Sequence, residues 1–306
     1  MELQNGCIES CPGCRFRGYS AEESGRRKQA WAESCLTPLH IRPLPLRAPA
    51  QRWGYRRKAL LHARHQNGGW EFGLLRRFGP QSRFAELVAI PDCPLHESSL
   101  NFRLMVLRTL IPLDAPLVFV QASGTIFTLV LKCARSEAWV AWARSLEPSL
   151  REAGVESLYL NWNPAAGRRA LSSRHQECVF GPALIADDGF VHGALSFRQQ
   201  IPEVEDAALS QAETFLAEAG VNTAVDFYSG AGASLARWVK RGWRTSGVEL
   251  VAEACRAAEV NAPGALVLKG RKEENPGAWN PGAGVSPRIR EGLGPICRRA
   301  VASRSR

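Results

Sequence analysis

Three cysteines near the start of the chain have a spacing that could bind a metal centre. Cys7, Cys11 and Cys14 lie within Cys-Ile-Glu-Ser-Cys-Pro-Gly-Cys, and Cys93 follows later in Ile-Pro-Asp-Cys-Pro-Leu. Three thiolates in one tight loop can share a centre that a fourth ligand from elsewhere completes. This set fits either an iron–sulfur cluster or a structural zinc. Buried or disulfide-bonded cysteines are the simpler alternative, and the spacing alone leaves it open.

A second group of residues could bind a nucleoside. The segment Asp226-Phe-Tyr-Ser-Gly-Ala-Gly232 joins an apolar run to a helical one, and its glycines allow a ligand to approach the backbone. Glu249 ends the next apolar run, where its carboxylate can accept both hydroxyls of a ribose. Residue 235 is Leu, so the Gly-x-Gly-x-x-Gly pattern of dinucleotide enzymes is not met. The pattern therefore points to S-adenosylmethionine. A plain turn with a solvated Glu249 is the alternative.

The residues around this turn alternate between strand and helix patterns. Strands are expected at 223–229, 244–250 and 265–269, and helices at 203–219, 233–241 and 252–260. A βαβαβ order of this kind predicts a parallel sheet. With three strands in this pattern, we expect an incomplete Rossmann-like domain.

The first two thirds of the chain have a different pattern. Strands are expected at 55–64, 70–77, 84–90, 117–121, 126–132 and 157–163, and helices at 20–36, 98–110 and 137–153. In the last of these helices, Trp139 and Trp142 have the spacing of core residues. The overall prediction is an α/β protein, in which a β-rich α+β cluster-bearing central domain (1–194) precedes a partial S-adenosylmethionine-binding domain (195–270). We expect residues 271–306 to be a disordered or frameshifted tail.

Composition restricts the setting of the chain. It has 306 residues, is 45% hydrophobic and carries a formal net charge of +10. No stretch approaches the ~20 apolar residues of a membrane helix, and no signal-peptide pattern begins the sequence. We therefore expect a cytoplasmic monomer that does not bind membranes. The basic first third indicates a polyanion partner, most simply RNA. Candidate phosphate-binding residues are Arg52, Arg56, Lys58 and Arg76.

Several segments together resemble one family, the RNA uracil-5-methyltransferases that carry a four-iron–four-sulfur (4Fe–4S) cluster. The resemblance runs from Cys7 to Lys269 and matches the branch without an oligonucleotide-binding barrel. Besides the cysteines and the glycine turn, the matching segments are Arg52-Trp-Gly-Tyr-Arg-Arg-Lys-Ala59, Glu71-Phe-Gly-Leu-Leu-Arg76, Glu86-Leu-Val-Ala-Ile-Pro-Asp-Cys-Pro94, Leu158-Tyr-Leu-Asn-Trp-Asn-Pro164 and Ser196-Phe-Arg-Gln-Gln-Ile-Pro202.

The resemblance implies a function and a set of binding residues. The function would be S-adenosylmethionine-dependent methylation of uracil C5 in rRNA or tRNA. The cluster ligands would be Cys7, Cys11, Cys14 and Cys93, and the cofactor would contact Gln199, Tyr228, Gly230, Gly232 and Glu249. Two positions depart from the family pattern, because Ile201 and Ala233 replace asparagines. The spacing between Cys7 and Cys11 is also shorter than is usual in the family.

The family's catalytic segments have no counterpart in the sequence. In this chemistry a cysteine thiolate adds to uracil C6 and a base later removes the C5 proton. Cys297 lies in Gly-Pro-Ile-Cys-Arg-Arg rather than in a Ser-Cys-Asn-Pro loop, so no catalytic residue is assigned. We therefore expect a C-terminally truncated and inactive methyltransferase. Two alternatives are a non-catalytic RNA-binding iron–sulfur protein and a zinc-stapled structural module without a cofactor.

Overall fold

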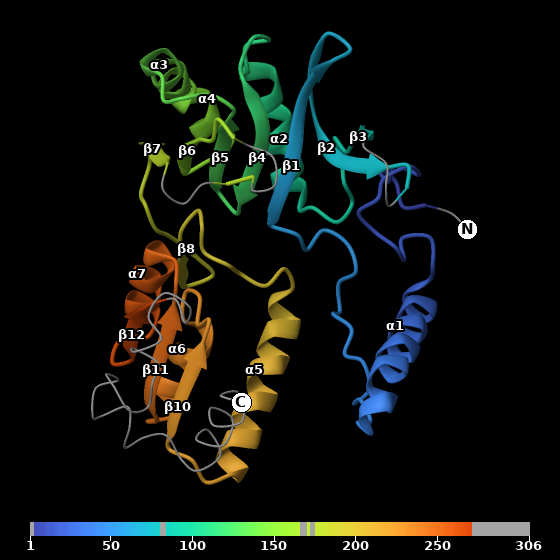
Figure 1. Ribbon diagram of the computed structural model, residues 1–306, viewed down its shortest axis with the longest axis vertical. Helices are drawn as coiled ribbons and strands as arrows, with labels where there is room; N and C mark the ends of the chain where they lie inside the picture. The colour runs from blue at the N-terminus through green and yellow to red at the C-terminus, as the bar shows by residue number, and fades with distance from the viewer. Residues whose placement is uncertain (1–2, 80–83, 166–169, 172–174, 271–306) are drawn as a thin grey trace. The chain divides into compact units, whose positions relative to one another are not determined.

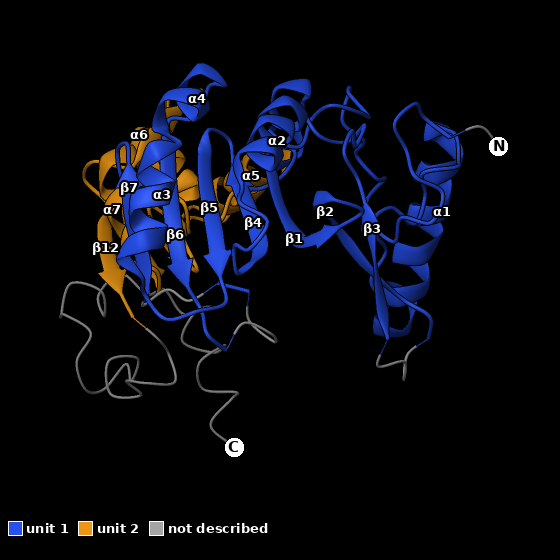
Figure 2. Cartoon of the chain, turned by 90° about the horizontal axis from the view of Figure 1, so that it is seen from above, with its two compact units in different colours: residues 1–183, 199–205 blue, residues 184–198, 206–306 orange. Residues whose placement is uncertain are grey.

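The computed structural model describes residues 3–79, 84–165, 170–171 and 175–270. The chain divides into two compact units (Figure 2). Unit 1 contains residues 1–183 and 199–205, and unit 2 contains residues 184–198 and 206–306. The domain boundary that the sequence indicates, between residues 194 and 195, falls inside the segment 184–198 that packs with unit 2. The expected tail, 271–306, lies outside the described residues.

Unit 1 is built on a seven-stranded sheet with the order β3-β2-β1-β4-β5-β6-β7 (Figure 1). All neighbouring strands are antiparallel except β5 and β6, which are parallel. The strands are β1 (Lys58–Gln66), β2 (Gly69–Arg77), β3 (Ala85–Ala89), β4 (Leu117–Ser123), β5 (Ile126–Leu131), β6 (Ser157–Trp162) and β7 (Gln176–Phe180). The helices are α1 (Ala21–Leu36), a 3₁₀-helix η1 (Thr37–Leu39), α2 (Ser98–Leu110), α3 (Glu137–Ser145) and α4 (Glu147–Glu152). This architecture confirms the predicted mixed α/β class.

The central strands of this sheet are buried on both faces. All six residues of β5 and all six of β6 are buried, which explains why both strands are largely apolar. The helix expected at 137–153 is two helices that meet at Leu146. Pro148 has no backbone N–H, so it cannot donate the hydrogen bond that would continue the first helix. Val140 and Ala143 are the buried residues of α3. Trp139 and Trp142 are only partly buried and pack edge-to-face on each other against that core.

Unit 2 contains a three-stranded parallel sheet with the order β10-β11-β12. Its strands are β10 (Thr223–Phe227), β11 (Arg244–Glu249) and β12 (Leu266–Lys269), and its helices are α6 (Ala233–Lys240) and α7 (Ala252–Asn261). A two-stranded hairpin, β8 (Ile185–Asp187) and β9 (Phe190–His192), precedes them. The core of the unit includes Leu235, Trp238 and Ala258. The predicted βαβαβ order is therefore present.

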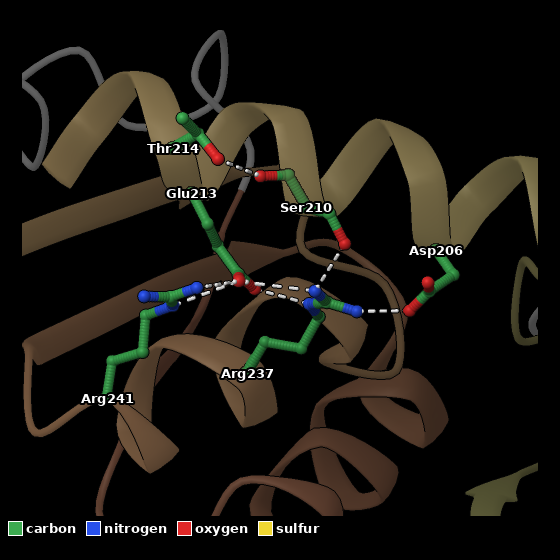
Figure 3. Close-up of polar contacts among 6 residues, drawn as sticks. All are labelled: Asp206, Ser210, Glu213, Thr214, Arg237 and Arg241. Atoms are coloured by element: carbon green, nitrogen blue, oxygen red, sulfur yellow. Dashed lines mark hydrogen bonds and ion pairs between the residues drawn. The ribbon is translucent and has the colours of Figure 1, made fainter. Parts of the chain in front are cut away.

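One buried carboxylate joins α6 to the preceding helix, α5 (Pro202–Glu218) (Figure 3). The Glu213 side chain is 3% exposed and pairs with both Arg237 and Arg241. Arg237 also donates to Ser210 at 2.8 Å and pairs with Asp206. These charge-assisted bonds lower the pKa of the Glu213 carboxyl, chiefly through Arg237. They fix α6, whose first residue follows the glycine turn.

Candidate cofactor and cluster sites

The glycine turn lies at the carboxyl end of β10, beside the carboxyl end of β11. Phe227 pairs with Val248 in the parallel register, so the two strand ends are neighbours. The backbone amides of Tyr228 and Ser229 both donate to the carbonyl of Val248, at 2.9 and 3.1 Å. In open α/β sheets, ligands bind outside the carboxyl ends of the strands. The turn is therefore placed where a cofactor can reach it.

Backbone conformation explains the residue types in this turn. Gly230 has φ +56° and Gly232 has φ +88°, both in the left-handed region. A β-carbon on Gly232 would lie 3.0 Å from the Cα and Cβ of Ala258, so glycine also lets α6 approach α7 closely. Tyr228 adopts φ +72° without being glycine, and its side chain is 83% exposed. Backbone strain at a residue that is not glycine is often found at functional positions.

Glu249 binds the turn directly. One carboxylate oxygen accepts from the amide of Gly230 at 3.0 Å. The other accepts from the amides of Leu250 and Val251 at 2.7 and 2.8 Å. A carboxylate offers about four acceptor positions, so three are used here. A ribose diol could take the remaining position and compete with the Gly230 amide. The geometry thus holds the carboxylate in a fixed orientation at the tip of β11.

A second carboxylate lies under the turn. Asp226 accepts a hydrogen bond from the Ser234 hydroxyl. Burial raises the pKa of the Asp226 carboxyl, and the charge of Glu249 raises it further, while the Ser234 bond lowers it. The sequence showed Asp226 as an acid before the turn, but it gave no sign that Ser234 would hold it. Asp226 and Glu249 thus place two carboxyl groups at this end of the sheet, close enough for the charge of Glu249 to act on Asp226.

Two further side chains hold the surroundings of the turn, and the sequence analysis missed both. The Asn261 amide donates to the carbonyl of Ala231 at 2.8 Å and exchanges two hydrogen bonds with Val191 of β9. Glu253 accepts from the amide of Leu195 at 2.8 Å, and burial raises its pKa. Both residues lie on α7 and hold the segment 184–198 against that helix. No local motif signals them, because each acts on residues that are distant in sequence.

Gln199 belongs to a different part of the chain from the other predicted cofactor residues. It is the first residue of the segment 199–205, which belongs to unit 1. Tyr228, Gly230, Gly232 and Glu249 lie together in unit 2. The structure thus brings four of the five predicted cofactor residues together around one turn.

The four predicted cluster cysteines also lie near one another. Cys7, Cys11, Cys14 and Cys93 are free thiols of intermediate exposure. Burial raises the pKa of the Cys14 thiol, and Cys93, Cys11 and Cys7 raise it further because their charges are close. Within the described ranges, no three His, Cys, Asp or Glu side chains are arranged tightly enough to hold a single metal ion. The charges of Cys7, Cys11 and Cys93 act on Cys14, so the four thiols are neighbours.

The other described cysteines have different surroundings. Cys35 and Cys178 are exposed, Cys133 is of intermediate exposure and Cys255 is buried. The Cys255 thiol donates to the carbonyl of Glu249 at 3.5 Å, within unit 2. Cys297 lies outside the described residues. None of these four described thiols is among the groups whose charges act on Cys14.

The predicted RNA-binding residues have intramolecular partners or lie near the cysteines. Arg52 donates to the carbonyl of Tyr19 at 2.6 Å and stacks on Trp53, so it fixes the cysteine-bearing segment. Burial raises the pKa of the Cys14 and Cys93 thiols, and Arg56 lies close enough for its charge to oppose that shift in each. Lys58 begins β1. Arg76 pairs with Glu86 at 2.8 Å across β2 and β3.

Comparison with known proteins gives matches in structure but not in sequence. No family model matches the chain, and no curated protein matches it in sequence. The Pyrococcus abyssi tRNA (uracil-54, C5)-methyltransferase, solved with S-adenosyl-L-homocysteine, superposes with a TM-score of 0.60 at 15% identity, covering 88% of this chain and 66% of that one. TYW2 of P. horikoshii, in complex with MeSAdo, gives a TM-score of 0.27 at 15% identity, covering 58% of this chain and 66% of that one.

The chain has a methyltransferase-like fold. That statement rests on the P. abyssi enzyme, whose match extends over both units. The aligned part spans just under two thirds of that enzyme's length. In the described residues, no helix is long and apolar enough to cross a membrane.

Proposed function

We propose that this chain binds S-adenosylmethionine at the Gly230–Gly232 turn, as part of a uracil-5-methyltransferase that acts on RNA. The observation that carries the proposal is the Glu249 carboxylate, which is held at the tip of β11 by the Gly230 amide and by its own following amides. It leaves an acceptor position facing the turn, where a ribose hydroxyl would donate. The resemblance of the motifs and the P. abyssi neighbour support uracil in RNA as the substrate.

Each residue of the turn has a defined part in this proposal. Glu249 would accept from the ribose, and the exposed Tyr228 ring would cover one face of the ligand. The glycines would let the ligand approach the start of α6. Asp226 and Glu249 would together favour the positive sulfonium. No residue in the chain is assigned as nucleophile or base, so we expect binding without methyl transfer.

Calorimetry with S-adenosylmethionine tests the cofactor site. Glu249→Ala removes hydrogen bonds to a charged acceptor, each contributing on the order of 1.5–3 kcal/mol, and should weaken affinity by at least tenfold. Glu259→Ala is the matched control, because Glu259 is an exposed residue of α7. Thermal unfolding should confirm that both variants remain folded. Equal affinity of the Glu249 variant and the parent would reject the site.

We further propose that Cys7, Cys11, Cys14 and Cys93 bind a 4Fe–4S cluster. The residues fit such a group, since four free thiols are mutually close and Arg56 lies beside them to offset thiolate charge. In a cubane cluster each cysteine binds a different iron atom. A tetrahedral zinc site, in which one ion binds all four thiolates, remains the alternative. When bound, the cluster would tie the N-terminal loop to the segment after β3.

Anaerobic reconstitution followed by iron and zinc analysis tests this assignment. We expect a brown protein that contains four irons, and we expect Cys93→Ser to lose the colour and most of the iron. Cys178→Ser is the control, since Cys178 is exposed on β7. A colourless protein containing one zinc would favour the zinc-stapled module. Iron retained in the Cys93 variant would contradict this ligand set.

Methyl transfer from labelled S-adenosylmethionine to RNA tests the activity of the chain itself. RNA binding without label would agree with the expected lack of turnover, and it is also what the non-catalytic RNA-binding alternative predicts. Cofactor affinity separates the two, because that alternative requires no S-adenosylmethionine binding. Labelled uridine would show that a nucleophile exists which the sequence analysis failed to assign.

A further inference from the structure

Unit 1 contains a cavity. It has a volume of about 440 Å³ and lies between α2 and the strands β1 to β3. This size is in the range of small-molecule sites, roughly 300–1,000 Å³. Its floor is apolar, formed chiefly by Leu61, Phe72 and Leu104. None of its lining residues belongs to unit 2.

The rim of the cavity carries an aromatic ring and a thioether that the fold leaves exposed. Phe102 is 50% exposed and Met105 is 48% exposed. They are three residues apart on α2 and therefore share one face of the helix. A large aromatic side chain half in water beside an apolar cavity offers a stacking surface for a flat ligand.

One end of the cavity presents a fixed acceptor. Asp92 lines the cavity, and its carboxylate accepts from the Asn101 amide at 2.9 Å. Asn101 is itself held, because it also donates to the carbonyl of Cys93 at 3.1 Å and bonds to the His96 ring at 2.9 Å. Asp92 is exposed, and its carboxylate has acceptor positions that Asn101 does not use. This end therefore favours a ligand edge rich in N–H groups.

The other end of the cavity presents a cation. Arg108 lines it and has no ion pair or hydrogen bond with any residue that the structure describes. Asn101, which holds Asp92, and Arg108 are seven residues apart on α2, a rise of about 10 Å. An arginine side chain on a helix leans toward the N-terminal end, which shortens the span to be bridged. The free guanidinium suits a phosphate.

We propose that this cavity binds one unpaired guanosine nucleotide of the RNA, separate from the uridine that would be methylated. The base would stack on Phe102, its N1–H and N2–H₂ edge would donate to Asp92, and its phosphate would meet Arg108. A carboxylate accepts readily from the two adjacent donors of guanine, whereas uracil offers it only one. The inference names a subsite of the proposed RNA-binding function and rests on RNA being the substrate.

Ligand-observed NMR and calorimetric titration with guanosine 5′-monophosphate (GMP) test the subsite without cofactor or target uridine. We expect GMP to bind at least fivefold more tightly than uridine 5′-monophosphate. Phe102→Ala should weaken GMP binding at least fivefold, since base–aromatic stacking contributes about 1–3 kcal/mol. Phe215→Ala, an exposed phenylalanine in unit 2, should leave it unchanged.

Two further variants test which residue contacts the base and which contacts the phosphate. Asp92→Asn should abolish the preference for GMP over uridine 5′-monophosphate. Arg108→Gln should make GMP and unphosphorylated guanosine bind equally, whereas the charge-matched Arg244→Gln, exposed in unit 2, should not. Equal binding of all mononucleotides, or GMP affinity unchanged by Phe102→Ala and Arg108→Gln, would overturn the proposal. Binding of an apolar dye that GMP does not displace would overturn it too.

The same variants separate this subsite from the wider function. An RNA oligonucleotide with one unpaired guanosine should bind more tightly than its adenosine counterpart, and Asp92→Asn should remove the difference. If the chain binds such RNA with no dependence on Asp92 or Phe102, the subsite fails while RNA binding stands. If GMP binds as described but no RNA binds, the proposed RNA function fails.

Discussion

Tyr228 shows how one residue can be placed for binding at a cost to the fold. Its φ of +72° is unfavourable for a bulky side chain, yet the ring is 83% exposed and so adds little packing energy. A neighbouring glycine could have taken this conformation without strain. The residue is therefore best explained by what its ring contacts when a ligand is present.

Replacing Tyr228 by glycine should change stability and cofactor affinity in opposite directions. Glycine relieves the left-handed strain, so we expect the free energy of unfolding to rise by about 1 kcal/mol. Loss of the ring should weaken S-adenosylmethionine binding severalfold. Denaturant unfolding and calorimetry measure the two effects. His40→Gly, at φ +56° in unit 1, should relieve similar strain and leave cofactor affinity unchanged.

A lower free energy of unfolding for Tyr228→Gly than for the parent would contradict this prediction. That outcome would mean that the exposed ring makes contacts that hold the turn. Unchanged cofactor affinity would remove Tyr228 from the proposed site and leave Glu249 and the glycines to define it.

At the scale of elements, the sequence predicted the helices and strands whose hydrophobic periodicity is strong. The parallel β10, β11 and β12 and the helices between them were expected within a few residues of their observed ends. Three short strands were missed. β7 is an edge strand with mixed burial, and β8 and β9 have three residues each. Such segments are too short for a period to emerge, and long-range pairing decides them.

The candidate site also contains residues that a local motif predicts and residues that only long-range contacts define. Gly230, Gly232 and Glu249 follow from local motif and spacing. Asn261 and Glu253 could not be predicted, because each bonds to backbone some sixty to seventy residues away. Asn101 and Phe102 likewise read as ordinary helix residues until α2 is placed beside β1 to β3. Tertiary contact, which a single sequence does not show, creates these roles.

The packing of α5 on α6 rests on Glu213, and its stability should depend on pH (Figure 3). The pKa of this carboxyl is lower in the folded state, so it stabilises the fold above its unfolded pKa of about 4.3. That stability is lost as the pH falls through the lower, folded pKa. Glu213→Gln should cost about 2 kcal/mol at pH 7, since one partner of a largely buried charge cluster is removed while the arginines remain partly exposed.

Urea unfolding between pH 7 and pH 3 measures this dependence. The difference between the parent and Glu213→Gln should shrink toward zero at the acid end. Glu218→Gln, on an exposed position of the same helix, should match the parent throughout. A constant difference across the range would show that packing, and not the carboxylate charge, accounts for the contribution of Glu213.

At the scale of the whole molecule, the net charge of +10 is the main argument for a polyanion partner. The structure shows that individual basic residues are not equivalent. Arg52 and Arg56 are tied to the cysteine-bearing segment, so changing them would disturb that loop as well as any RNA contact. Arg76 is the cleaner candidate, because it lies on β2 and pairs with Glu86 of β3 rather than with the cysteine-bearing segment.

RNA binding by Arg76 should appear in the salt dependence of affinity. Each neutralised phosphate of a single strand contributes about 0.7 to the slope of log affinity against log salt. Arg76→Gln should therefore reduce that slope by about 0.7 and weaken binding similarly for all sequences. Glu86→Gln should instead strengthen RNA binding at low salt and steepen the slope, because it frees the Arg76 guanidinium for phosphate. Fluorescence anisotropy with a labelled single-stranded RNA measures both slopes. If both variants have the parent's slope, Arg76 lies off the RNA path, and the net charge must act through other residues.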